Sequence, residues 1–256
     1  MSSEKRFGYE WNKYDKINPN YEMQFLKWAY PLKKNDFENK KVLDAGCGMG
    51  RNSFWALKYG ASELTAFDFD KNSVEAAKKN LSCFKNARVE FKSIYEINYK
   101  KEFDISFSIG VIHHLKYPEK AVKNLIKAVK SGGIVLIWVY GYKGNEWIVK
   151  IVDPIRKNIT SKLPVGLVHF ISYFMSIPLW AFVKLFKGPG LYLKQLSGFK
   201  LWHIHSIVFD QLIPEVANYW KKEEVLGLFS DFNDLISSIN IYPVNNNSWT
   251  VLVKKK

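Results

Sequence analysis

A glycine-rich loop between an apolar run and a helical run is the most informative feature of the sequence. Residues 42–53 read VLDAGCGMGRNS, with Gly46, Gly48 and Gly50 at every second position. Glycine lets the chain turn sharply and lets a ligand approach bare backbone. The GxGxG spacing is one residue shorter than the GxGxxG of dinucleotide sites, where a pyrophosphate reaches the helix N-terminus. Asp44 lies two residues before the first glycine, and a carboxylate there suits a cationic amine better than an anion.

A second carboxylate completes this pattern. Asp68 ends the apolar run LTAFD and lies 20 residues after Gly48. A carboxylate at the tip of the second strand can accept hydrogen bonds from both hydroxyls of a ribose. The loop and the two acids together indicate a site for a nucleoside with a positively charged tail that carries no phosphate. S-adenosylmethionine has that shape. A tight strand–helix turn without a ligand is the simpler alternative, but it does not explain why acid and glycines occur together.

Histidines are the candidate general bases, because imidazole titrates near neutral pH. His113 and His114 follow the apolar run FDISFSI. Either ring also has a structural alternative, in which it packs against or caps the next helix. We take His114 as the first candidate base and His113 as a further one.

A second histidine pair lies in the segment LWHIHSIVFDQ, which adds His203 and His205, followed by Asp210 and Gln211. If the segment is extended, the two histidines share one face. Such a cluster suits a polar substrate pocket or a base with its orienting partner, and His205 is the second candidate base. The alternative is an HxH pair on an exposed strand.

The elements that position these residues alternate between strands and helices from residue 41 onward. We expect helices at 51–59, 71–80 and 117–129, and strands at 42–45, 64–67, 89–91, 103–109 and 134–139. The last strand is uninterrupted apolar sequence, as a strand covered on both faces requires. The alternation predicts an α/β fold with a parallel sheet wrapped by helices.

The alternation stops near residue 144 and resumes near residue 216, which predicts an inserted cap. We divide the chain into an aromatic-rich N-terminal arm (1–40), a core (41–143), a largely helical cap (144–215) and a closing segment (216–256). The closing segment is expected to hold a helix near 221–229 and strands near 235–241 and 249–253. Three asparagines, 245–247, form a turn signal between those strands, so the strands should be antiparallel.

On these motifs the chain resembles the class I S-adenosylmethionine-dependent methyltransferases. The resemblance covers residues 41–139 and is carried by VLDAGCGMGRNS, LTAFDFDKNSVEAAKKN, VEFKSIYEI, FDISFSIGVIHHL and LIKAVKSGGIVLIWVY. It implies a Rossmann-like sheet of seven strands, mostly parallel with the last strand antiparallel, and helices on both faces. It also implies S-adenosylmethionine as the cofactor and S-adenosylhomocysteine as the product.

The resemblance further implies a role for each residue that matches a family motif. Toward the methionine end it places Asp44, Gly46, Ser108 and Ile109; around the ribose, Gly48 and Asp68; and around the adenine, Phe69, Ile94 and Tyr95. The loop residues Cys47, Gly50 and Asn52 complete the implied contacts. Many relatives hold the adenine amino group with an acidic residue after the third strand; here backbone and Glu96 are the alternatives. Tyr14 in the arm, and Tyr140, Tyr142 and Asn145, are candidates to close over the site.

The charge balance invites a nucleic-acid or membrane partner but does not require one. With 38 Lys and Arg against 24 Asp and Glu, the net charge is +14. Only four basic residues are arginine, the side chain that best matches phosphates and guanine edges, and the lysines are spread along the chain. A solvated lysine-rich surface is therefore the favoured interpretation. The two cysteines lie in no metal-binding pattern, so no metal is expected. The first residues hold no apolar run of signal-peptide length, which favours a cytoplasmic protein.

One segment departs from ordinary soluble sequence. Residues 163–183 contain no Asp, Glu, Lys or Arg, and 15 of these 21 residues are apolar. That length could cross a bilayer. Pro164, Gly166 and Pro178 interrupt the segment, so two short helices bent near Pro178 and buried in the cap are expected. A membrane-surface element and a true crossing are the alternatives.

The leading functional hypothesis is a small-molecule methyltransferase, O-directed, with its acceptor pocket in the cap. The positive charge favours a phosphorylated or otherwise anionic acceptor among sugars, polysaccharide precursors and secondary metabolites. One alternative is a lipid or quinone methyltransferase that touches the inner membrane through 163–183. Another is a non-catalytic partner that binds S-adenosylmethionine or RNA. Base-modifying enzymes are disfavoured, because Ser108-Ile109-Gly110-Val111 replaces their proline motif and neither cysteine follows a proline. The oligomeric state is left open.

Overall fold

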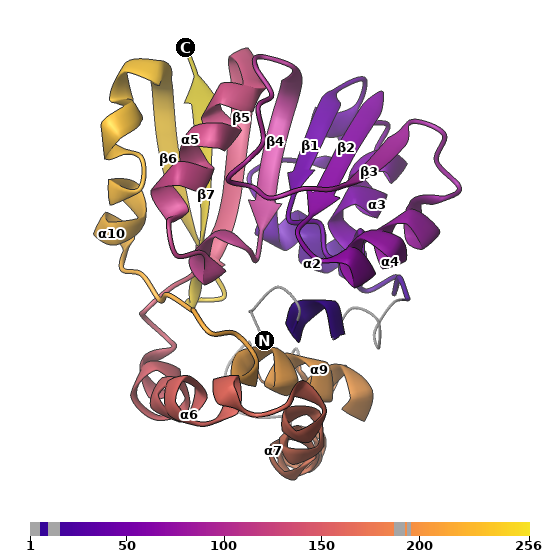
Figure 1. Ribbon diagram of the computed structural model, residues 1–256, viewed down its shortest axis with the longest axis vertical. Helices are drawn as coiled ribbons and strands as arrows, with labels where there is room; N and C mark the ends of the chain where they lie inside the picture. The colour runs from indigo at the N-terminus through magenta and orange to yellow at the C-terminus, as the bar shows by residue number, and fades with distance from the viewer. Residues whose placement is uncertain (1–5, 10–15, 187–192, 194–195) are drawn as a thin grey trace.

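The computed structural model describes residues 6–9, 16–186, 193 and 196–256, and its strands form one seven-stranded sheet (Figure 1). The strand order is β3-β2-β1-β4-β5-β7-β6. The strands are β1 (Lys41–Ala45), β2 (Glu63–Asp68), β3 (Ala87–Phe91), β4 (Phe103–Ile109), β5 (Val129–Tyr140), β6 (Ile236–Val244) and β7 (Ser248–Lys255). β7 pairs antiparallel with both β5 and β6, and the pairings among β1 to β5 are parallel. The predicted sheet is confirmed, including the single antiparallel strand.

Helices cover both faces of this sheet, because successive side chains of a buried strand point to opposite faces. Val42 packs in a core with residues of α2 (Tyr21–Trp28), α3 (Arg51–Lys58) and α4 (Lys71–Leu81). Leu43 packs in a second core under α5 (Pro118–Ala128) and α10 (Lys222–Gly227). The apolar side of α5, formed by Ala121, Val122, Leu125 and Ile126, is fully buried there.

Two sequence-derived element boundaries shift in the structure. β5 begins at Val129, so Ser131, Gly132 and Gly133 lie inside the strand, where its register against β4 shifts. The closing strands are longer than expected and meet at a tight turn, where Asn245 and Asn246 have positive φ angles of 53° and 59°. Asparagine tolerates that left-handed conformation, so the predicted antiparallel pair is confirmed.

The expected cap contains helices that lie beyond the carboxyl ends of the parallel strands (Figure 1). They are η3 (Ile148–Val152), α6 (Asp153–Asn158), η4 (Thr160–Lys162), α7 (Val165–Phe186) and α9 (Leu201–Leu212). Residues 6–9 form a helical turn between these helices and the sheet. Of the N-terminal arm (1–40), the structure therefore places this turn between cap and sheet and packs α2 in the core on one face of the sheet.

The expectation of two short helices bent at Pro178 is wrong. α7 is a single helix of 22 residues with Pro178 inside it. A proline removes one backbone hydrogen bond, but α7 is held along its length by packing on α9. Among the described residues, α7 is also the one helix whose length and composition would suit a membrane crossing.

The expectation that this segment is buried in the cap is also wrong. Only four residues of α7 are buried, and they face α9: Val168, Ser172, Ser176 and Val183. Large apolar side chains on the other side are exposed, such as Phe170 at 60% and Phe174 at 70%. The cap is one layer of helices, so nothing among the described elements covers the outer side of α7.

The HxH segment is helical rather than extended. His203 and His205 belong to α9, where residues two apart point to nearly opposite sides because each residue turns the helix by about 100°. The shared face expected for an extended segment is therefore absent, and the two histidines have different surroundings.

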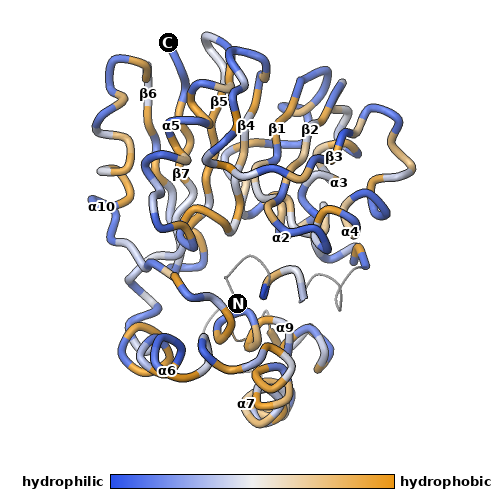
Figure 2. The backbone as a smooth tube through the Cα atoms, viewed as in Figure 1, coloured by the Kyte–Doolittle hydropathy of each residue, from blue (hydrophilic) through white to orange (hydrophobic). Residues whose placement is uncertain are grey.

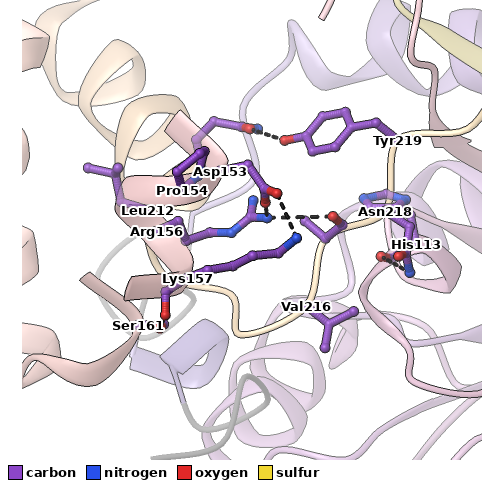
Figure 3. Close-up of polar contacts among 12 residues, drawn as sticks. His113, Asp153, Pro154, Arg156, Lys157, Ser161, Leu212, Val216, Asn218 and Tyr219 are labelled. Carbon is purple, nitrogen blue, oxygen red and sulfur yellow. Dashed lines mark hydrogen bonds and ion pairs between the residues drawn. The ribbon is translucent and has the colours of Figure 1, made fainter. Parts of the chain in front are cut away.

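A buried ion pair joins the cap to the segment that returns to the core (Figure 3). The Arg156 guanidinium is fully buried, pairs with the Asp153 carboxylate and lies 3.5 Å from the Ala217 carbonyl. Lys157 Nζ lies 2.7 Å from the second Asp153 oxygen. One residue further on, the Asn218 amide donates to the His113 carbonyl at 2.8 Å. Asp153 thus neutralises a charge that solvent cannot reach.

We expect Asp153→Ala to lower the free energy of unfolding by about 3–5 kcal/mol, because it leaves a buried guanidinium without its counter-ion. The double variant Asp153→Leu with Arg156→Met should recover most of that loss, since it removes both charges. Urea unfolding followed by tryptophan fluorescence measures the change. Glu75→Ala breaks the exposed Lys78–Glu75 pair and is the matched control, which should unfold like wild type. An Asp153→Ala protein as stable as that control would contradict the assignment.

Candidate functional site

The loop between β1 and α3 is held in a conformation that requires glycine. Gly46, Gly48 and Gly50 have φ angles of +81°, +53° and +81°. A Cβ at Gly46 would also lie 2.5 Å from a methyl carbon of Val111. The amides of Gly46 and Cys47 donate to the Phe67 carbonyl at 2.9 and 3.0 Å, which fastens the loop to the end of β2.

Asp68 joins this loop to the neighbouring strand. One carboxylate oxygen accepts the Gly48 amide at 2.9 Å, and the other accepts the Asp70 amide at 3.0 Å. Burial raises the pKa of Asp68 to about 6, although these amides oppose the shift. The carboxylate lines the cavity described below, so a ligand there can reach it.

Asp44 lies behind the loop, away from the cavity lining. One of its oxygens accepts the Ser53 hydroxyl at 2.6 Å. The other is buried and has no hydrogen-bond partner among the described residues. Burial raises the pKa of Asp44 to about 7, and the Asp68 charge adds to the shift. A positively charged group bound at the loop would favour the ionised form of both acids, so the two carboxylates fit a cationic ligand.

A cavity of about 640 Å³ runs from this loop to the cap. Nine of the expected cofactor-binding residues line it: Gly46, Cys47, Gly48, Asn52, Asp68, Phe69, Ile94, Tyr95 and Ile109. Asp44, Gly50 and Ser108 do not. Gly50 is the N-cap residue of α3 and packs against α4. The buried Ser108 hydroxyl donates to the Ala45 carbonyl at 2.8 Å. Tyr14 lies outside the described residues.

His114 lines the same cavity. Its Nδ1 lies 2.8 Å from the Val216 carbonyl, which can only accept a hydrogen bond, so Nδ1 carries the proton. Nε2 then has a bare lone pair and no protein partner among the described residues. Burial lowers the pKa of His114 to about 4, so the ring is neutral at physiological pH.

The other candidate histidines have structural surroundings. His113 is fully buried, and its ring lies 3.8 Å from that of Tyr140, away from the cavity lining. His205 packs between α7 and α9, with Nδ1 2.9 Å from the Ser176 hydroxyl and its ring stacked on Tyr173. His203, on the other side of α9, does line the cavity. A base role for His113 or His205 stays a prediction, and His114 is the candidate base that reaches the cavity.

A chain of polar side chains forms one wall of the cavity near His114. The Tyr219 hydroxyl donates to Gln211 at 2.9 Å, and the Gln211 amide donates to the Tyr140 hydroxyl at 3.1 Å. Tyr140 in turn donates to Asp210 at 3.3 Å. Tyr140, Asp210 and Gln211 were expected near the site from the sequence, whereas Tyr219 was missed because it lies in a segment without a motif.

The N-terminal turn closes the cavity from a third side. The Phe7 ring lines it, with its centroid 4.9 Å from that of His114. Arg6 is buried and donates to the Thr160 and Leu163 carbonyls of the cap at 3.0 and 2.5 Å. Gly8 touches the Asp70 side chain, where a Cβ would have no room. This turn was expected only as part of an arm, since four residues carry too little pattern to place it.

Comparison with known proteins agrees with this geometry. Residues 36–153 match a family model described as a methyltransferase domain. The chain is 28% identical over 145 residues to a mitochondrial ubiquinone biosynthesis O-methyltransferase of Dictyostelium discoideum, covering 52% of this chain and 44% of that protein. It is 29% identical over 135 residues to a tRNA U34 carboxymethyltransferase of Nautilia profundicola, covering 52% and 44%. The chain thus spans less than half the length of these two relatives.

Solved structures show the same fold. A magnesium protoporphyrin IX methyltransferase from Synechocystis with bound S-adenosylhomocysteine aligns over 94% of this chain and 89% of its own, with a TM-score of 0.54 and 11% identity. Fold, glycine loop and family match agree on the class: residues 36–153 match a methyltransferase domain, and the sheet that contains them has the class I methyltransferase fold. S-adenosylmethionine is its cofactor, and the loop, Asp68 and the cavity fit that nucleoside.

We expect Asp68→Ala to weaken binding of S-adenosylhomocysteine about 10- to 100-fold, because hydrogen bonds to a charged acceptor are lost. Isothermal titration calorimetry measures the affinity. Asp104→Ala is the matched control. Asp104 pairs with Lys130 at the amino end of β4, whereas Asp68 lies at the carboxyl end of the parallel strand β2. Unchanged affinity in Asp68→Ala, with wild-type circular dichroism, would refute the assignment.

The raised pKa values of Asp44 and Asp68 make cofactor binding pH-dependent. The ligand's ammonium favours ionised carboxylates, and without ligand these acids titrate at about 7 and 6. Binding therefore releases protons, and affinity should rise as pH increases from about 5 to about 8. Asp44→Asn should reduce the pH dependence of cofactor affinity at the upper end of this range, near the Asp44 pKa of about 7. A wild-type affinity independent of pH over this range would contradict the proposed charge coupling.

Proposed function

We propose that this protein transfers a methyl group from S-adenosylmethionine to an oxygen atom of a small-molecule acceptor held between core and cap. The observation that carries the proposal is the position of His114. His114 lines the cavity whose other end is lined by the glycine loop and Asp68, and its Nδ1–Val216 hydrogen bond leaves Nε2 unprotonated. A base and a nucleoside site that share one cavity are what methyl transfer to a hydroxyl requires.

Bound S-adenosylmethionine supplies a methyl group on a positively charged sulfur, which is already a strong electrophile. The chain's own residues mainly have to align the acceptor and exclude water. The cap helices and Phe7 enclose the cavity, while Asp68 and the loop fix the nucleoside end. Orientation of this kind can lower a barrier by several kcal/mol.

His114 handles the proton. Its Nε2 accepts the proton of the acceptor hydroxyl as the carbon–oxygen bond forms and the methyl–sulfur bond breaks. The Val216 carbonyl keeps Nδ1 protonated, so the lone pair always lies on Nε2. The low pKa of His114, about 4, keeps that lone pair available at physiological pH.

The cavity walls define an acceptor with a polar head and an apolar body. Near His114 the wall is the Tyr219–Gln211–Tyr140 chain. Toward the cap it is apolar, formed by Leu179, Leu196, Phe199, Ile207 and Val208. Lys27 and Arg51 add positive charge to the cavity wall, and Asp210, at the end of the polar chain, adds a negative charge. The anionic acceptor expected from the sequence is thus extended here to an amphiphilic one, and the similarity to a ubiquinone biosynthesis O-methyltransferase supports methylation of oxygen.

Radiolabelled cofactor tests the proposal. Purified protein is incubated with methyl-tritiated S-adenosylmethionine and three fractions of a bacterial lysate: organic-solvent extract, RNA and protein. We expect label in the organic extract, in a base-stable methyl ether. Label confined to RNA or to protein would overturn the small-molecule assignment, and absence of label in all three would overturn the activity.

We expect His114→Ala to lower turnover of the labelled acceptor about 10²- to 10⁴-fold, the usual contribution of a positioned base. Its affinity for S-adenosylhomocysteine should stay near that of wild type, because His114 serves the acceptor end. At saturating cofactor, wild-type turnover should be level between about pH 6 and 8, since the pKa of His114 is about 4. The variant's residual rate should instead climb with pH, because solvent must remove the proton. Normal turnover in His114→Ala would exclude it as the base.

A further inference from the structure

Helix α7 carries large apolar side chains on the side that faces away from the molecule. The side that packs on α9 contains Ser172 and Ser176, whose hydroxyls donate to carbonyls one turn earlier at 2.7 and 2.6 Å. The side that faces away carries Phe170, Phe174 and Leu185, exposed by 60%, 70% and 75%. A helix of a water-soluble domain normally does the opposite. The outer side of α7 is therefore built to contact something apolar.

A second apolar stripe lies on the neighbouring helical stretch. Trp147, Ile151, Ile155 and Ile159 follow one another at intervals of four residues, and their exposed fractions are 58%, 59%, 43% and 53%. That spacing puts them on one side of η3 and α6. Scattered single apolar residues are normal on a protein surface, but two aligned stripes are not.

Both stripes lie at the same end of the molecule. α6 and α7 are the elements farthest from the sheet (Figure 1), and hydrophobic residues run along α7 (Figure 2). We call these two stripes together the cap surface. Trp147 belongs to the cap surface and also lines the cavity, so the cap surface reaches the wall of the candidate active site.

Exposed charge beside the cap surface is mostly positive among the described residues. Lys157 and Lys184 are exposed there, and the carboxylates nearby are Glu146, which accepts the Gly144 amide, and Asp153. Asp153 is already paired with Arg156 and Lys157. Lys150 and Lys162 are exposed beside the stripes. An apolar face with a cationic border matches the surface of an anionic bilayer.

We propose that the cap surface docks on a bilayer that contains anionic phospholipid, with α7 lying in the plane of the interface. A second copy of the chain is a poorer occupant, because two such surfaces would bring like charges together. A crossing would strip α7 from α9, to which it is joined by the Ser176–His205 hydrogen bond at 2.9 Å. The consequence for catalysis rests on the proposed function. Docking would bring the cavity wall at Trp147 to the bilayer, from which an amphiphilic acceptor would enter.

Vesicle flotation of the full chain tests the docking. Wild type is mixed with phosphatidylcholine vesicles, with or without roughly one-third phosphatidylglycerol, at an ionic strength of about 0.1 M. We expect flotation with the anionic vesicles only, and release at about 1 M salt. Phe170→Ser with Phe174→Ser should reduce the bound fraction at least about tenfold, because both side chains then lose their apolar contact. Lys150→Glu with Lys162→Glu should also reduce it.

Two matched controls separate docking from general changes in apolarity and charge. Met23→Ser with Leu235→Ser removes exposed apolar side chains outside the cap, which are 78% and 40% exposed. Lys123→Glu with Lys127→Glu reverses exposed charges on α5. Both controls should float like wild type. Each variant is also checked for S-adenosylhomocysteine binding, which reports on the fold of the core.

Each remaining result counts against one claim. If wild type binds S-adenosylhomocysteine but stays in the bottom fraction of the gradient, the docking proposal is wrong and the proposed function is unaffected. Cap variants that float like wild type overturn the docking proposal as well. A dimer in analytical ultracentrifugation that the phenylalanine variant abolishes, without vesicle binding, makes a second copy the occupant. If the protein floats with the vesicles but methylates no acceptor, the proposed function is wrong and the docking proposal is supported.

Discussion

The carboxylate of Asp68 is the contact on which the rest of the site depends. It bonds the Gly48 amide at 2.9 Å and the Asp70 amide at 3.0 Å, so one side chain fixes the loop after β1 and the turn after β2 together. Asp70 then begins α4 by accepting the Ser73 amide and leaves room for Gly8 of the N-terminal turn. The cavity that these contacts outline is therefore set by backbone geometry, and it can receive a nucleoside without rearrangement of the sheet.

The core could be read from the sequence because its signals are local. The VLDAGCGMGRNS loop must turn sharply wherever it stands, and an apolar run such as residues 134–139 suits only a covered strand. The cap could not be read in this way. His203 and His205 share a face in an extended chain and face apart in α9, and only the packing of α9 on α7 decides between the two. Tyr219 reaches the cavity because the chain returns from cap to core there, which no local pattern records.

The cap combines two surfaces of unlike character on one layer of helices. Its inner side meets the cavity with Leu179, Leu196 and Ile207, and its outer side presents Phe170 and Phe174. Ser172 and Ser176 lie in the seam between α7 and α9 together with Val168 and Val183. A helix with apolar groups on both open sides can line an acceptor pocket and contact an apolar phase at once. The buried Asp153–Arg156 pair holds this layer to the segment that carries Val216, whose carbonyl orients His114.

A crystal structure of the protein with S-adenosylhomocysteine tests the central claim most directly. The account predicts the ribose hydroxyls within hydrogen-bonding distance of the Asp68 carboxylate, the adenine beside Phe69 and Ile94, and the sulfur on the side of the cavity that His114 lines. Crystals that leave the loop empty at saturating ligand would contradict it. So would a nucleoside bound elsewhere in the chain, or a nicotinamide dinucleotide seated in its place.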